Sequence, residues 1–139
     1  MDDDMLITAR VRVHLVPAVL ALANPPWQRD VWLDPSMFEN LDHIFHTLFD
    51  DFCDADHPER YLGIGLRTEE EVGLMRQLGA ALDTAQTEAP NETDAEYLRA
   101  DSWPQVVAIA GRLAQVMIAN DLGELLALHE ARATSEAPQ

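Results

Sequence analysis

Apolar residues near the start of the chain recur at helical spacing. They fall at steps of three and four residues: Val13, Val16, Leu20 and Ala23. Residues 7–15 also alternate between apolar and polar, as a half-buried strand would. Ala and Leu dominate the second half of the segment, which favours a helix that ends before Asn24. We predict that helix, with Pro17 either kinking it or marking a restart in a first turn.

Three later segments carry the sequence signature of a capped helix N-terminus. A Ser or Thr stands three residues before a Glu at 36–39, 68–71 and 93–96. The hydroxyl can accept the third amide while the carboxylate reaches back to the first, so a helix is predicted to begin at each segment. The first would be the core helix, because its apolar residues form one wide stripe. These are Met37, Phe38, Leu41, Ile44, Phe45, Leu48, Phe49 and Phe52.

Two more helices are predicted in the last third of the chain. Trp103-Pro104 opens one of them, because proline is tolerated in a first turn, and Trp103 is expected to pack into the core. A last helix after Asn120 would carry a leucine-rich arm over residues 122–128 that can pack against a second copy. The small polar residues of 132–139 indicate a flexible tail.

Two short apolar runs, 31–33 and 61–66, are typical of strands. The predicted fold class is therefore α+β and predominantly helical, with about five helices around one core and one or two short strands. A chain of 139 residues has the size of one domain. We expect a single globular domain over 1–131, followed by the tail.

Cysteine usage and the chain start indicate a cytoplasmic protein. The single cysteine, Cys53, excludes an internal disulfide and any CxxC motif. The first four residues include three aspartates, where a secretory signal needs a basic start and an apolar run. The longest apolar stretch, 13–23, is too short to cross a bilayer, so we expect no membrane contact.

Charge is the most unusual property of the composition. Nine arginines face 25 acidic residues, which gives a net charge of −16, and there is no lysine. The absence of lysine excludes a phosphate-binding loop that ends in Gly-Lys, a Schiff-base lysine and a Ser-Lys nucleophile pair. A field this negative repels nucleic-acid phosphate and favours cationic partners. We therefore expect no nucleic acid among the partners.

One face of the helix predicted from Ser36 carries groups that could bind a metal. Asp42, His46 and Asp50 stand four residues apart, and His57 follows within reach. Imidazole and carboxylate at this spacing can share a divalent ion. A solvated helix face is the simpler interpretation, because no ligand from another element can be named. Histidine–aspartate pairs of this kind also arise by chance in an acidic helix, so catalysis is the less favoured hypothesis and no cofactor is expected.

An acidic cluster closes the same helix. It consists of Asp50, Asp51, Asp54 and Asp56. Negative charge at a helix C-terminus opposes the helix dipole by about 0.3–1 kcal/mol for each group. Such a cluster is a reasonable docking spot for the arginines of a basic protein.

Several segments in the later two-thirds of the chain resemble a known family. They are HTLFDD (46–51), GIGLR (63–67), TDAEYL (93–98) and WPQVV (103–107). In order and spacing they are similar to a family of small, acidic, uncharacterised actinobacterial proteins. The absence of lysine fits the GC-rich genome of such an organism. The resemblance implies a shared fold and a bacterial cytoplasmic home, without an activity or a catalytic residue.

The function predicted from the sequence is a non-enzymatic interaction module. It would bind a basic protein partner through its acidic face, as an immunity protein or an antitoxin-like inhibitor does. One alternative is a small metal-assisted enzyme that uses Asp42, His46 and Asp50. Another is a dimeric scaffold subunit that associates through the 122–128 arm.

Overall fold

The computed structural model describes the backbone of residues 3–136 and the side chains of residues 5–132. Six α-helices occur in this part of the chain. They are α1 (Asp3–Leu22), α2 (Pro25–Trp27), α3 (Leu41–His46), α4 (Glu69–Thr87), α5 (Asp94–Arg99) and α6 (Trp103–Glu136). Two π-helical turns, η1 (Gln28–Trp32) and η2 (Thr47–Asp51), continue α2 and α3, and a 3₁₀ turn, η3 (Pro58–Tyr61), precedes α4.

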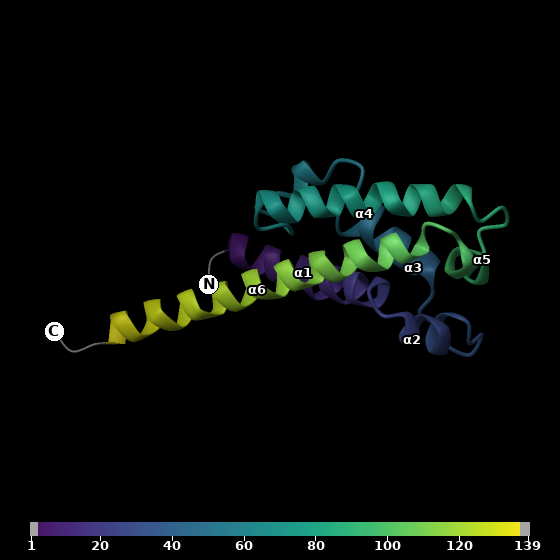
Figure 1. Cartoon of the computed structure of the whole chain (residues 1–139). Coiled ribbons are helices and arrows are strands. Elements are labelled where there is room, and N and C mark those ends of the chain that lie inside the picture. The colour runs from purple at the N-terminus through teal and green to yellow at the C-terminus, as the bar shows by residue number, and fades with distance from the viewer. Residues whose placement is uncertain (1–2, 137–139) are drawn as a thin grey trace.

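The three long helices form the body of the molecule. In Figure 1, α6 runs beside α4 and α1, and it makes its most extensive contacts with these two helices. The far end of α6 projects beyond the rest of the body (Figure 1). We call residues 121–132 the arm; all but Asp121, which is half-buried, are exposed.

The prediction that the first element is a helix is confirmed. The buried face of α1 holds Leu15, Val19 and Leu22 at helical spacing, and all three are fully buried. Val13 is 66% exposed although Leu15, two residues away, is fully buried, which a strand with one buried face would not give. Pro17 lies inside the helix.

The helix predicted to begin at Ser36 begins instead at Leu41, with Asn40 as its cap. Ser36 is held by Asp34, whose carboxylate accepts the Ser36 amide (2.9 Å) and hydroxyl (2.7 Å). Phe38, expected in the core, is 99% exposed. The Ser36 signature fails because a nearer acceptor captures the serine.

Glu39, the other half of that expected capping box, is held by tryptophans. The indole N–H groups of Trp27 and Trp32 both donate to its carboxylate, the second over 3.1 Å. The glutamate therefore fastens the loop before α3 to α2 and η1.

The other two capping signatures mark true helix starts. Thr93 and Glu96 form the complete reciprocal box at α5. Thr68 caps α4 by accepting the amide of Glu71, but the Glu71 side chain does not reach back to it. That carboxylate is directed into the interior.

The predicted strands are wrong: no β-strand occurs within residues 3–136. Val31 and Trp32 belong to η1. Residues 61–66 fold into a turn. In this turn the Tyr61 carbonyl accepts hydrogen bonds from the amides of residues 64, 65 and 66, each at a distance of 3.0 Å. An isolated bridge between Leu62 and Leu66 is the β-type pairing found there. The described chain is all-α, because neither run has a neighbouring strand with which to pair.

The two helices expected in the last third are one. α6 continues without a break past Asn120 and through Glu136, so much of the expected tail is helical, and 137–139 lie outside the described residues. Trp103 packs as predicted: it is 5% exposed, and its indole donates to Gln28 (3.0 Å). Gln28 in turn donates to the last carbonyls of α1. This link joins the end of α1 to the start of α6.

Two helices have the length and apolar composition of a membrane span. The windows are Met5–Leu22 in α1 and Trp103–Arg132 in α6, with mean hydropathies of 1.6 and 1.2. Core helices of globular proteins have the same properties, and 39% and 28% of these windows are buried inside the chain. The expectation that the chain does not cross a bilayer stays a prediction.

Candidate functional site

Carboxylates from α3, η2, the following loop and α4 surround an open hollow of about 200 Å³, which we call the acidic hollow. It is lined by Asp42, Phe45, His46, Phe49, Asp50, Asp56, Asp83 and Gln86. Four of these are aspartates, and no arginine is among them. The hollow therefore concentrates negative charge over a partly apolar floor.

His46 bridges two of the carboxylates. Its Nδ1 is 3.0 Å from Asp50 Oδ2, and its Nε2 is 3.6 Å from Asp42 Oδ2. The hydrogen bond with Asp50, followed by the charge of Asp42, raises the pKa of His46 above 6.5. Both ring nitrogens thus face carboxylates, an arrangement that favours the imidazolium.

Asp83 completes the hollow from α4. Partial burial, and then the neighbouring charge of Asp56, raise the pKa of Asp83 above its usual value. The part of this shift that comes from Asp56 shows that the two carboxylates repel each other, and no arginine lies in the lining beside them.

The acidic cluster predicted as a docking spot is divided by the fold. Asp50 and Asp56 line the acidic hollow. Asp51 lines a different hollow, beside His14 and His43. Asp54 is only 27% exposed, accepts the amide of Asp56 (3.1 Å) and lies 3.8 Å from Arg60.

The structure brings together part of the predicted metal set. Asp42, His46 and Asp50 meet in the acidic hollow, whereas His57 lies near Glu59, at 3.8 Å. Within the described residues, no group of three or more His, Cys, Asp or Glu side chains is arranged to hold a metal. Cys53 is fully buried, and that burial raises the pKa of its thiol to about 12.

A second charged constellation lies in the interior, where α1, α4 and α6 meet. Arg12 is 4% exposed and Glu71 0%, and Arg12 Nη1 donates to Glu71 Oε1 over 2.5 Å. The same guanidinium donates to the backbone carbonyls of Gly65 (3.0 Å) and Met117 (2.9 Å). One side chain of α1 therefore binds α4, α6 and the turn that precedes α4.

Three further residues complete this ion-pair network. Glu71 accepts the amide of Arg67 (2.9 Å) and the side-chain amide of Asn120 (2.7 Å). Asp121 Oδ1 accepts from Arg12 Nε (3.1 Å) and Arg67 Nε (2.7 Å). Every buried side-chain nitrogen and oxygen of the described residues has a partner. These hydrogen bonds offset the free-energy cost of removing a buried ion pair from water.

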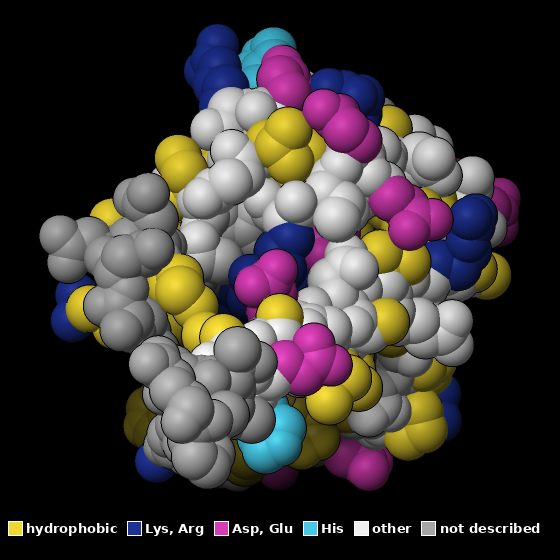
Figure 2. All heavy atoms as spheres, turned by 90° about the vertical axis from the view of Figure 1, so that its left-hand side faces the viewer, with side chains coloured by type: hydrophobic (Ala, Val, Ile, Leu, Met, Phe, Trp, Pro, Cys, Tyr) yellow, Lys and Arg dark blue, Asp and Glu magenta, His cyan; other side chains and the backbone are white. Residues whose placement is uncertain are grey.

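A cavity of about 460 Å³, which we call the arm cavity, opens above the network, between the first half of α1 and the arm. Its lining comprises Met5, Thr8, Ala9, Arg12, Val13, Gly63, Arg67, Asp121, Glu124, Leu125 and Leu128. Figure 2 faces this end of the molecule and shows basic and acidic side chains side by side, deep in a hollow bordered by apolar ones. Apolar walls with a few convergent polar groups are the usual form of a small-molecule site.

The residues of the ion-pair network are not among the candidate site residues predicted from the sequence, although the sequence contains a pattern that indicates them. In α1, Arg12 occupies a helical stripe whose other members, Thr8, Leu15 and Val19, are buried. Glu71 likewise begins the buried stripe of α4. A charged residue in a buried stripe requires a partner, so one such residue of each sign predicts this pair.

The packed long helices define a small all-α domain with two surface hollows, one acidic and one largely apolar. The chain belongs to the family DUF7945, a domain of unknown function, whose family model matches residues 6–125. The match covers every residue of the acidic hollow and of the ion-pair network. No curated protein and no solved structure matches the chain. The predicted membership of an uncharacterised family is confirmed.

Proposed function

We propose that this protein is a non-enzymatic interaction module that binds a basic protein partner through the acidic hollow, as an immunity protein or antitoxin-like inhibitor does. The supporting observation is the convergence of Asp42, Asp50, Asp56 and Asp83 from separate segments on one open surface without an arginine in its lining. The apolar rings of Phe45 and Phe49 in the same lining offer contact area for the stems of arginine or lysine side chains.

Electrostatics support a cationic partner. Because the pKa of Asp83 is raised by burial and by Asp56, its ionised form is destabilised until an opposite charge arrives. A guanidinium placed between these two carboxylates would relieve their repulsion. The net charge of −16 would also steer a basic protein toward the surface and raise its association rate.

The same charge disfavours nucleic acid and anionic lipid as partners, because their phosphates are repelled. The proposal places the complex in the cytoplasm of an actinobacterial cell. A partner of this kind presents clustered arginines or lysines, and its binding weakens as salt rises.

The test combines capture with kinetics. The intact chain is used to capture proteins from an actinobacterial lysate at low and moderate salt, and a captured basic protein is then purified. Its association rate is measured against the intact chain and a variant in which Asp42, Asp50, Asp56 and Asp83 are all replaced by Asn. We expect the variant to associate at least tenfold more slowly and with weaker salt dependence, as for other steered pairs.

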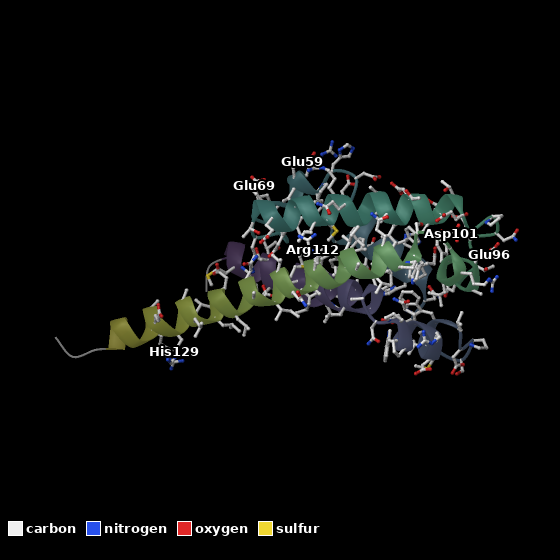
Figure 3. All side chains as sticks on the ribbon, in the orientation of Figure 1. Glu59, Glu69, Glu96, Asp101, Arg112 and His129 are labelled. Carbon is white, nitrogen blue, oxygen red and sulfur yellow. The ribbon has the colours of Figure 1, made fainter. Side chains whose placement is uncertain are left out.

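A matched control changes the same number of charges away from the hollow. It combines Asp30→Asn, Glu69→Gln, Glu70→Gln and Asp101→Asn, all at exposed positions. Glu69 and Asp101 lie at opposite ends of the body, as Figure 3 shows. If both variants associate equally slowly, net charge alone accounts for the effect, and the proposed role of the hollow is overturned.

A second candidate function, self-association, is supported by the arm. Ile118, Leu122 and Leu126 stand four residues apart on one face of α6 and are 40%, 57% and 62% exposed. His129, one turn further along, projects from the arm away from the body (Figure 3). An exposed apolar stripe on a projecting helix is the pattern of a helix–helix interface.

Charge is compatible with this interface. Residues 5–16 and 121–132, whose side chains the structure describes, together carry three arginines and three acidic residues, so these two stretches are balanced in a chain of net charge −16. Two copies can therefore bring these two stretches together without strong repulsion between them.

Light scattering over a range of concentrations tests the interface. The intact chain is expected to approach twice its monomer mass, and the variant Leu122→Glu with Leu126→Glu to stay monomeric. The control places Glu at the exposed Gln105 and Ala108 on the body portion of α6. A monomeric mass for the intact chain at every concentration would refute self-association.

A further inference from the structure

The arm cavity has the size and lining of a small-molecule site and is separate from the acidic hollow. Its volume of about 460 Å³ lies within the range of about 300–1,000 Å³ for ligand pockets. Its walls are formed from α1 by Ala9 and Val13 and from the arm by Leu125 and Leu128. The exposed stripe of Ile118, Leu122 and Leu126 is not part of this lining, so self-association does not require the cavity.

The floor of the cavity offers a donor and an acceptor side by side. Arg67 and Asp121 both line it and are 24% and 31% exposed. Among the contacts of the described residues, Arg67 bonds through its amide and Nε, and Asp121 through Oδ1. The Nη groups of Arg67 and Oδ2 of Asp121 remain available at the edge of the network.

Charge in and around the floor selects against an ionic ligand. Arg12 and Arg67 are balanced by Glu71 and Asp121, so the network is formally neutral. Glu124 of the arm also stands in the lining. An anionic head would lie beside Asp121 and Glu124, whereas a cationic head would lie beside two arginines. A neutral head that both accepts and donates fits this surface best.

We propose that the arm cavity binds a neutral amphiphile whose carboxamide head contacts Arg67 and Asp121 and whose apolar tail lies between α1 and the arm. The carbonyl oxygen accepts from the Arg67 guanidinium, and the amide N–H donates to Asp121 Oδ2. Val13, Leu125 and Leu128 cover the tail; Val13 and Leu125 are 66% and 62% exposed without it. The inference goes beyond the proposed function and does not rest on it.

Three probes with one tail and different heads test the ligand class. Octanamide, octanoate and octylamine are titrated calorimetrically into the full chain at neutral pH. Octanamide is expected to bind saturably at one molecule per chain, and the two ions at least tenfold more weakly, because each leaves a polar floor group unpaired or facing like charge. Tighter binding of octanoate or octylamine, equal binding of all three or no binding of octanamide would overturn the proposal.

Two substitutions locate the site. Ala9→Phe places a ring in the cavity from an exposed position of α1, so the fold need not rearrange, and it is expected to abolish octanamide binding. Ala80→Phe makes the same change at an exposed position of α4 away from the cavity and should leave binding intact. Circular dichroism and thermal melting of both variants verify folding. Binding that persists in Ala9→Phe would place the ligand elsewhere and refute the assignment.

Discussion

At the residue scale, the most consequential interaction is the buried pair of Arg12 and Glu71. Both side chains leave water almost completely, so each depends on the other for compensation of its charge. The Arg12 guanidinium also donates hydrogen bonds to backbone carbonyls of two other segments. Loss of the arginine therefore removes these contacts together and leaves the buried charge of Glu71 without its cationic partner.

Replacement of Arg12 by Met is expected to lower the free energy of unfolding by about 3–5 kcal/mol, as for other buried pairs broken on one side. The double variant Arg12→Met with Glu71→Gln should recover part of this loss, because the stranded charge is gone while the side-chain oxygen still accepts. Urea denaturation followed by circular dichroism measures both. A double variant no more stable than Arg12→Met alone would show that the stranded charge is not the main cost.

His46 provides a second residue-scale prediction. Its pKa is raised above 6.5 in the folded chain, first through Asp50 and then through Asp42. A raised pKa stabilises the fold fully below the unfolded value near 6.5, and this stabilisation is lost as pH rises through the folded pKa. The stability difference between the intact chain and His46→Gln should accordingly shrink as the pH rises through that range.

An NMR titration of the imidazole tests the cause directly. The His46 pKa should exceed that of an unstructured peptide, and Asp50→Asn should lower it. His43, on the same helix, serves as an internal comparison. A His46 titration that does not respond to Asp50→Asn would contradict the contact.

At the scale of elements, helices specified by local patterns could be predicted from sequence, whereas those specified by distant contacts could not. Thr93 and Glu96 cap α5 as predicted because both partners are local. The signature at Ser36 fails because Asp34 captures the serine and tryptophans of an earlier segment capture Glu39. The predicted strands fail because strand pairing requires a second element, which neither run has.

The same distinction holds for the candidate sites. The helical spacing of Asp42, His46 and Asp50 correctly brings these residues to one hollow. Asp83 joins them from α4, and no local pattern indicates which face of α4 meets α3. The arm cavity depends on the turn before α4 lying against α1, which is likewise a property of packing.

Glycines at helix contacts give an element-scale prediction. A Cβ at Gly79 of α4 would lie 2.8 Å from the carbonyl oxygen of Ala55, whereas a Cβ at Gly73 of the same helix meets nothing within 4 Å. Gly79→Ala should therefore lower the free energy of unfolding by about 1–3 kcal/mol, the usual cost of overpacking. Gly73→Ala should raise it by up to about 1 kcal/mol through helix propensity.

Chemical denaturation of both glycine variants measures the difference. They carry the same substitution in one helix, so propensity cancels and the contact with Ala55 remains. Stabilisation by Gly79→Ala would show that the segment around Ala55 does not pack tightly against α4.

At the scale of the whole molecule, charge is distributed unevenly. Carboxylates converge on the acidic hollow, while residues 5–16 and 121–132 beside the arm cavity carry equal numbers of arginines and acidic residues. Interaction with a basic protein and self-association would therefore use different surfaces. One copy could take part in both.

Net charge also predicts how salt affects stability. Self-repulsion at −16 opposes the compact state, and added salt screens it, because the Debye length shortens from about 30 Å at 0.01 M to about 8 Å at 0.15 M. The melting temperature should rise with sodium chloride over this range. Differential scanning calorimetry provides the measurement, and a melting temperature that falls would indicate that attractive ion pairs outweigh the repulsion.

The rate at which reagents label the buried thiol of Cys53 reports how often the fold opens. Thiol reagents attack the thiolate, which is scarce at neutral pH in a group with a pKa of about 12 and no exposed surface. Labelling of the native chain should therefore be far slower than labelling in urea, and its rate should follow the opening of the core around α4. Mass spectrometry can time this reaction on the intact chain.

A cysteine added at any exposed position would react much faster than Cys53. A dye could therefore be attached selectively at the added cysteine without removal of the native residue.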